Sequence, residues 1–369
     1  MQRAKFSPLC FFACAYLSSN ALVSILSNLR KLFSYSIFNP YKTPYTGPRL
    51  LPTKGALTDA MNQNEYTPLH HAALNGHTST VQQLLMSGSL ITAVDKDKNT
   101  PLHLAAWKSH TDVVELLLDK GAPVHAQNKD LNTPLHLAAW SGHTSVVKVL
   151  VRYSSWRQYR NRYGNSPLHL AIVRGHTCIV DLLLAEGAYI EAVGENHNTP
   201  LHLASRNGWT SIVKLLFKNG VLIQPRNQVN NTPLHLAAWN GHIGVVELLL
   251  EITDLIEARN NFNDTPIRLA ILGGHTGIVE LLLENGKLFE TWKDQYVNTP
   301  LHLAARSGHA GIVKLLFRKG TSIEAMGKLR RVVILLRWSY CLQNALQLEL
   351  QIMILRLHCI LPHGVVMWM

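Results

Sequence analysis

Cysteines are few in this 369-residue sequence, and recognisable catalytic motifs are missing. The five cysteines are scattered and form no CxxC pair, so the sequence predicts neither a disulfide framework nor a cysteine zinc site. The motifs GxxxxGK[ST], HExxH, GxSxG and a strand-borne GxGxxG are also absent. We therefore predict a protein that is not an enzyme and uses no cofactor or metal. Few, scattered cysteines also suit a reducing compartment, and we expect a cytoplasmic protein.

Acidic residues are absent from positions 1–58, which hold seven lysines and arginines. Residues 327–369 add a net charge of +4, so residues 59–326 retain only +1 of the total +12. A nucleic-acid-binding domain would carry this positive charge on its folded body. We therefore do not expect nucleic acid as a partner.

One phrase fills most of the remaining sequence, and from Asn231 it is written NTPLHLAAWNGHIGVVELLLEITDLIEAR. Threonine is a good helix N-cap and proline fits the first helical position, so each Thr-Pro predicts the start of a short helix. The following Gly-His predicts a left-handed end to that helix, and VVELLL predicts a second, more apolar helix closed by Gly-Ala. The pair recurs in register along the chain, with only the last interval one position longer, at Thr67, Thr100, Thr133, Ser166, Thr199, Thr232, Thr265 and Thr299.

At these residues the chain resembles the ankyrin-repeat family, whose unit of about 33 residues carries a TPLH signature. The resemblance covers roughly residues 55–326 in eight repeats. It implies an all-α fold, an ankyrin-type α-solenoid of stacked helix-turn-helix repeats with short projecting turns or hairpins. It also implies a non-catalytic scaffold or adaptor that binds a protein partner, of unknown identity, on its concave face and turn tips.

Fourteen of the nineteen histidines occupy two positions of the repeat. In the family, histidines at these positions hydrogen-bond within and between repeats, so we predict scaffold roles for them rather than metal binding. Seven belong to TPLH, and seven follow the Gly or Ser that ends the first helix: His70, His103, His136, His169, His202, His235 and His302, and then His77, His110, His143, His176, His242, His275 and His309.

The turn tips depart from the family pattern, which places glycine two residues before the threonine. Only one of these positions is glycine and two are asparagine, which tolerates a left-handed backbone. The other five tips must either form a different turn or accept strain. In chain order the positions hold Glu65, Lys98, Leu131, Gly164, His197, Asn230, Asn263 and Val297.

Candidate partner-binding residues lie in a column just after HLAA. The column reads Leu74, Trp107, Trp140, Val173, Arg206, Trp239, Leu272 and Arg306. Because Trp and Arg dominate binding hot spots, the candidates are Trp107, Trp140, Arg206, Trp239 and Arg306. The alternative is that the Trp rings pack on adjacent repeats and stiffen the stack.

A second candidate site is RYSSWRQYRNRYG, residues 152–164, where the Gly-Ala closure is lost. Arginines alternate with aromatic residues there, and such a pattern can bind an acidic or phosphorylated segment through bidentate hydrogen bonds and cation–π contacts. The candidate residues are Arg157, Tyr159, Arg160 and Arg162. The alternative is a drifted loop whose arginines are solvated.

Residues 1–54 form a basic leader without a full repeat. Arg3 and Lys5 before an apolar stretch resemble a secretory signal, while many serines and no acids suit an organellar presequence. A third interpretation is a misassigned or foreign leader, because RLLPTKGA resembles the remnant of a repeat's second helix. A genuine leader would make the protein a secreted or organelle-targeted regulator or effector that acts through its termini.

Residues 327–369 form an apolar tail that matches no repeat. Charged Arg337, Glu349 and Arg356 interrupt its apolar run, so we do not expect a membrane helix or a membrane partner. The stretch LRLHCILPHG faintly resembles the SOCS box that recruits a ubiquitin ligase, and a real box would make the protein a ligase adaptor.

A one-base shift of the reading frame gives the tail a different origin. Residues 360–367 then encode HLAAWSGH, the octapeptide at 136–143, so we predict a frame change between residues 325 and 333 that the nucleotide sequence can test. Such a tail lacks a polar terminal cap. We therefore expect Leu315 and Leu316 to be either poorly covered or covered by the tail.

Overall fold

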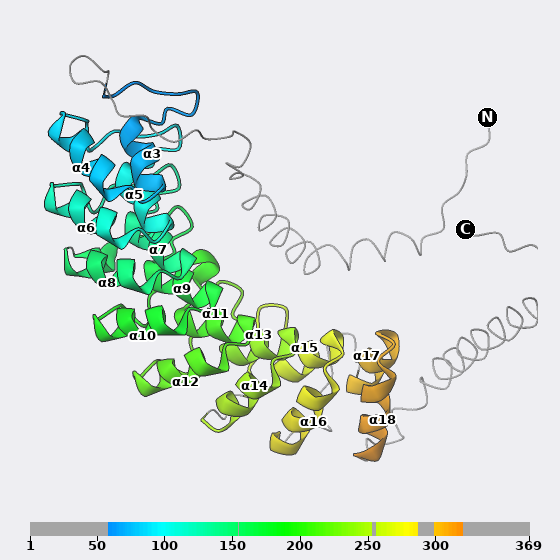
Figure 1. The fold of residues 1–369 in the computed structure, drawn as a ribbon. Helices are drawn as coiled ribbons and strands as arrows, with labels where there is room; N and C mark the ends of the chain where they lie inside the picture. The colour runs from blue at the N-terminus through cyan, green and yellow to red at the C-terminus, as the bar shows by residue number, and fades with distance from the viewer. Residues whose placement is uncertain (1–57, 154, 253–255, 287–298, 320–369) are drawn as a thin grey trace, which may run out of the picture. The chain divides into compact units, whose positions relative to one another are not determined.

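The computed structural model describes residues 58–153, 155–252, 256–286 and 299–319, which form sixteen α-helices, two short 3-10 helices and no strand. The all-α prediction is therefore confirmed. The helices come in pairs along the chain, an inner helix that begins after Thr-Pro or Ser-Pro and an outer helix that follows it (Figure 1). The predicted leader 1–54, the tail 327–369 and the tip Val297 lie outside the described residues, as do the activities assigned to the two ends.

Each inner helix begins at the proline of the repeat phrase, as predicted. The preceding Thr or Ser is the N-cap in extended conformation, and its side chain and that of the residue three positions on satisfy each other's backbone N–H groups in seven of the eight repeats. The inner helices are α3 (Pro68–Leu74), α5 (Pro101–Trp107), α7 (Pro134–Ser141), α9 (Pro167–Arg174), α11 (Pro200–Asn207), α13 (Pro233–Asn240), α15 (Pro266–Gly273) and α17 (Pro300–Arg306).

The outer helices form a second layer. Each outer helix packs on its own inner helix and on the outer helices of neighbouring repeats, and the inner helices pack on one another in the same order. The predicted stack of helix pairs is thereby confirmed. The outer helices are α4 (Thr78–Met86), α6 (Thr111–Asp119), α8 (Thr144–Arg152), α10 (Thr177–Ala185), α12 (Thr210–Lys218), α14 (Ile243–Leu250), α16 (Thr276–Asn285) and α18 (Ala310–Arg318).

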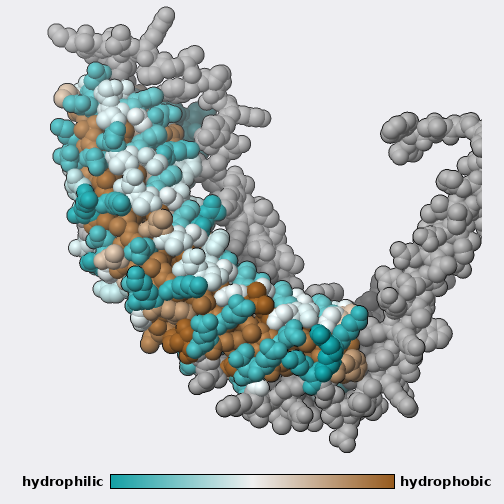
Figure 2. Space-filling model, turned by 60° about the horizontal axis from the view of Figure 1, so that its bottom comes forward, coloured by the Kyte–Doolittle hydropathy of each residue, from teal (hydrophilic) through white to brown (hydrophobic). Residues whose placement is uncertain are grey.

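The hydrophobic core lies between the two helix layers. Leu102, Ala105 and Ala106 of α5 belong to the same buried cluster as Val114 and Leu117 of α6, the outer helix on which α5 packs. The small alanines allow neighbouring inner helices to approach closely. Along the face drawn in Figure 2, apolar residues form a strip that follows the stack between hydrophilic residues. No helix could bury its apolar face alone, so stacking of repeats supplies the core.

The last described helix pair differs from one of our two expectations. Leu315 and Leu316 are completely buried, so the expectation that they are poorly covered is wrong. The other expectation, coverage by the tail, concerns residues outside the described part of the chain.

Histidines link every described repeat to its neighbours. The first set binds the next repeat: His136 Nδ1 accepts from the Thr133 N–H at 3.2 Å, and its Nε2–H donates to the Asn165 carbonyl at 3.1 Å. His70, His103, His169, His202 and His235 repeat this pattern. The second set, His110, His143, His176, His242, His275 and His309, donates to carbonyls of the preceding inner helix. These histidines have the predicted scaffold roles.

Asparagines add a third link between repeats. Asn128 Nδ2 donates to Asn99 Oδ1 at 2.9 Å, and the same bond recurs one repeat later from Asn161 to Asn132. It recurs again from Asn227 to Asn198 and from Asn260 to Asn231. The hairpin bases of successive repeats are thus tied by side chains.

The boundary between α9 and α11 departs from this scheme. Gly194 replaces the linking asparagine, and the backbone N–H of Glu195 donates to Asn165 Oδ1 instead. Trp209 replaces the second histidine, and its ring lies against Gly175. Of the two histidine links, this boundary therefore keeps only the bond from His169 to the Asn198 carbonyl.

The turn tips accept strain. All seven described tips have positive φ, including Glu65 at 61°, Lys98 at 60° and Leu131 at 58°. At His197 the turn also differs, because Asn196 has positive φ within the 3-10 helix η2 (Glu195–His197). An Asn or Asp three residues before most tips holds the hairpin, as Asn128 Oδ1 does by accepting from Asp130 N and Asn132 N at 3.0 Å.

Replacing Leu131 by glycine should therefore stabilise the protein. A left-handed non-glycine residue costs about 1–2 kcal/mol, which the Leu131→Gly substitution removes, less the greater entropy of glycine in the unfolded chain. We expect a gain of about 0.5–1 kcal/mol, measured by urea unfolding. The control is Leu222→Gly at an exposed leucine without positive φ, which should lower stability. Equal effects of the two substitutions would contradict strain at the tip.

Candidate partner-binding site

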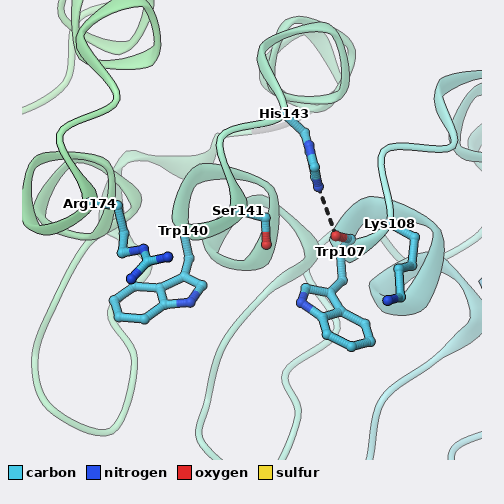
Figure 3. A pocket seen from close by; sticks show the side chains of 6 residues that line it. All are labelled: Trp107, Lys108, Trp140, Ser141, His143 and Arg174. Carbon is cyan, nitrogen blue, oxygen red and sulfur yellow. Dashed lines mark hydrogen bonds between the residues drawn. The ribbon is translucent and has the colours of Figure 1, made fainter. Parts of the chain in front are cut away.

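Trp107 and Trp140 lie at the C-terminal ends of the successive inner helices α5 and α7. The alanines before them are buried between repeats, so these positions fall at the edge of the inner layer, where both rings are half-buried. Figure 3 shows the two indoles on the same side of the two helices. The structure therefore brings these two predicted residues together.

Each tryptophan has a cation beside its ring. Lys108 Nζ lies 4.0 Å from the centroid of the Trp107 ring, and Arg174 Cζ, from α9, lies 4.9 Å from the centroid of the Trp140 ring. Both distances fall within the range of cation–π attraction. Together with Ser141 and His143, these four side chains line an open pocket of about 400 Å³ (Figure 3). We call these six residues the Trp–cation pocket.

The main chain beneath the pocket is fixed by the second set of histidines. His143 Nε2 donates to the Trp107 carbonyl at 2.8 Å, and His176 Nε2 donates to the Trp140 carbonyl at 3.1 Å. Burial lowers the pKa of His143, which favours its neutral form. The two tryptophans are therefore held in place by the neighbouring repeats.

The remaining column candidates lie apart from this pocket. Arg206 on α11 and Trp239 on α13 are half-buried, and Arg306 at the end of α17 is exposed. The carbonyls of Arg206 and Trp239 accept from His242 and His275, so their backbone is anchored in the same way.

In the second predicted site, residues 152–164, the structure buries the aromatic residue Trp156. Only 4% of Trp156 is exposed, and the residue belongs to the hydrophobic core. In other repeats the residue that closes the outer helix is buried, as Ala122 and Val221 are. The corresponding residue in this segment is Ser155, which is exposed. Trp156 begins the 3-10 helix η1 (Trp156–Gln158) and takes over the closure that Gly-Ala provides elsewhere.

The candidate arginines of this segment bind the chain's own main chain. Arg157 Nε donates to the Glu186 carbonyl at 3.0 Å, at the end of α10. Arg160 Nη1 donates to the carbonyls of Arg157 and Tyr159 at 2.8 and 3.0 Å. The Arg157 bond ties the loop to the end of α10, and the Arg160 bonds hold the loop's own main chain, roles that the sequence pattern did not predict.

Arg162 and Tyr159 contact the preceding repeat. Arg162 forms an ion pair with Asp130 at 3.6 Å and donates to the Lys129 carbonyl. The Tyr159 ring stacks on His125 with centroids 4.6 Å apart. The four candidates are thus spread along the loop and do not converge on one cavity among the described residues.

Four residues of the pocket were not predicted from the sequence as binding residues: Ser141, His143 and the two cations Lys108 and Arg174. Both cations directly follow the column, after Trp107 and Val173. The sequence could have shown the two cations, because they occupy the same repeat position, the one directly after the column. In successive repeats that position reads Lys108, Ser141, Arg174, Asn207 and Asn240.

The described residues contain no group of three or more His, Cys, Asp or Glu side chains arranged to hold a metal ion. None of their helices has the length and apolar character needed to span a bilayer.

Comparison with protein families gives a match over most of the chain. The family model described as ankyrin repeats (3 copies) matches residues 46–128, 123–193, 189–260 and 252–326. A search of curated proteins finds no match. The family match, the helix pairs and the histidine links agree, and the chain belongs to the ankyrin-repeat family.

Proposed function

We propose that this protein is a non-catalytic scaffold or adaptor that binds a protein partner on its inner helices and hairpin tips, with the Trp–cation pocket at the centre. Proteins of the ankyrin-repeat family are typically protein-binding modules. The observation that carries the proposal is the pairing of two half-buried tryptophans, each beside a cation, around one open pocket. Half-buried Trp rings offer a large rigid contact area at little cost in side-chain entropy. The scattered cysteines suit action in the cytoplasm.

Replacing both tryptophans tests this proposal. The Trp107→Ala/Trp140→Ala variant of the full chain should capture the partner at least about tenfold less well, because hot-spot residues contribute about 2 kcal/mol or more. The measurement is affinity capture from lysate with quantitative mass spectrometry, using wild type as reference. The two indoles lie at the edge of the inner layer, so the helical circular dichroism should persist.

The matched control is Tyr189→Ala, which removes an aromatic ring that is 62% exposed in a loop outside the pocket. This variant should capture the same proteins as wild type. If the double tryptophan variant also captures them equally well, the rings only stiffen the stack and the proposed surface is wrong.

A further inference from the structure

The acidic residues of the described α-helices are confined to the outer layer, which also carries lysines and arginines. The inner helices carry Arg174, Arg206, Arg306 and Arg268, the last paired with Asp264, and Lys108 lies directly after α5. None of the eight inner helices contains Asp or Glu. The outer helices hold all the acidic residues of the described α-helices: Asp112, Glu115, Asp119, Asp181, Glu247, Glu280 and Glu284. The inner layer is therefore cationic, although residues 59–326 as a whole carry a net charge of only +1.

Two acidic side chains at the hairpins, Asp97 and Asp130, have cationic partners. Asp97 pairs with Lys129 at 3.6 Å, and Asp130 pairs with Arg162 at 3.6 Å. Their charge is therefore offset locally. The positive potential of Lys108 and Arg174 is not cancelled by these two carboxylates.

Helix polarity would ordinarily disfavour an anion here, because the pocket lies at the C-terminal ends of α5 and α7. The histidine links reduce the negative potential at these helix ends. One carbonyl near the end of each helix, that of Trp107 in α5 and that of Trp140 in α7, already accepts an N–H bond from His143 or His176. These two carbonyls therefore present less negative charge to a ligand at the pocket, where Lys108 and Arg174 supply positive charge.

We propose that the Trp–cation pocket binds an acidic segment of a partner protein, with an apolar or aromatic side chain on the indoles and carboxylates at Lys108 and Arg174. The inference rests on the proposed function and specifies its partner. Neighbouring inner helices lie about 10 Å apart, so the two cations are separated by about 10–20 Å. An extended segment covers that distance in about three to six residues.

The test is selection of a random-peptide phage library on the full chain, with counter-selection on the Trp107→Ala/Trp140→Ala variant. Selected peptides should have an apolar or aromatic residue flanked by Asp or Glu. Synthetic copies measured by fluorescence anisotropy should bind at least about tenfold more weakly to Lys108→Gln and Arg174→Gln, which is a loss of about 1.4 kcal/mol. Peptides in which Asp and Glu are replaced by Asn and Gln should bind the wild-type chain similarly weakly. The affinity of the acidic peptides for the wild-type chain should fall as the salt concentration rises.

Controls with equal loss of charge are Lys148→Gln on α8 and Lys214→Gln on α12, two exposed lysines of the outer layer. Both should bind the peptides as wild type does. Selection of neutral or basic peptides that depend on the tryptophans but not on Lys108 or Arg174 would overturn this inference and leave the proposed function standing. Failure to enrich any tryptophan-dependent peptide would overturn both. Tighter binding of oligothymidylate than of the acidic peptides at this pocket would assign it to nucleic acid and overturn the inference.

Discussion

Acidification from pH 7 to pH 5 should lower the free energy of unfolding by about 10 kcal/mol, an amount comparable to the whole stability of many domains. The cause is the set of TPLH histidines, all of which except His302 are completely buried. Burial lowers the pKa to about 4 for His103, His169, His202 and His235, and to about 3 for His136, from an ordinary value of 6.5.

The hydrogen bonds explain why these rings must stay neutral. Nδ1 accepts the N–H of the threonine or serine N-cap, as in the 3.2 Å bond from Thr133 N to His136 Nδ1. A proton on Nδ1 would face that N–H, so protonation breaks the cap. Since the charged form is also desolvated, the folded state takes up protons only at low pH.

The direction of the pH effect follows from these lowered pKa values. Above pH 6.5 both states are neutral and the full stability is present, whereas between about pH 6.5 and pH 4 the unfolded chain binds more protons. In this window each such histidine lowers the free energy of unfolding by about 1.4 kcal/mol per pH unit, or by about 2 kcal/mol at pH 5. Five such histidines together lower it by about 10 kcal/mol.

Urea unfolding at several pH values measures this slope. His136→Gln should reduce the number of protons taken up on unfolding at pH 5 by about one. The control His197→Gln replaces an exposed histidine at a hairpin tip and should leave the slope unchanged. Stability that is flat between pH 7 and pH 5 would show that these histidines are not held neutral in the folded state.

Asp264→Asn should destabilise the seventh repeat by about 3–5 kcal/mol, because it removes one partner of a buried ion pair. This repeat has TPIR in place of TPLH, and Arg268 Nε forms an ion pair with Asp264 Oδ1. Arg268 and Asp264 are 9% and 5% exposed. All seven other repeats have His at the position of Arg268, and all but the first, which has Tyr66, have Asn at the position of Asp264, so the two residues have changed together.

The double variant Asp264→Asn/Arg268→His should recover most of the lost stability, because it restores the residues of the other repeats. Arg268→His alone should be destabilising, since it leaves the buried Asp264 carboxylate facing a neutral ring. Hydrogen–deuterium exchange of α15 and α16 reports the local effect, and α5 serves as the internal reference. Additive losses in the double variant would refute a direct coupling of the two side chains.

The repeat phrase contains most of the fold. Thr-Pro defined each helix start because N-cap and first-turn preferences are local, and the regular spacing of the phrase defined which helices stack. The histidine roles followed from the same periodicity. The hairpin tips could not be decided, because the choice between a different turn and a strained φ at Leu131 depends on bonds such as those to Asn128.

The candidate sites were harder to predict than the fold, because they depend on which arginine side chains already contact other parts of the chain. Tryptophan position placed Trp107 and Trp140 side by side, but the cation beside Trp140 comes from the next repeat, through Arg174. In 152–164 the alternating pattern gave no sign that Trp156 fills the core or that Arg157 binds the Glu186 carbonyl. These contacts depend on residues of the neighbouring repeat, so the sequence of the segment alone does not predict them.

The boundary between α9 and α11 has a mechanical consequence. When the stack is stretched along its length, load passes from repeat to repeat through parallel bonds, and this boundary has lost one of them where Trp209 replaces a histidine. A stretched molecule should therefore part early at this boundary, which separates the pair α9 and α10 from the pair α11 and α12, giving two blocks that each keep their own core. Pulled by its two ends, the protein would extend in one early step before any single repeat unravels.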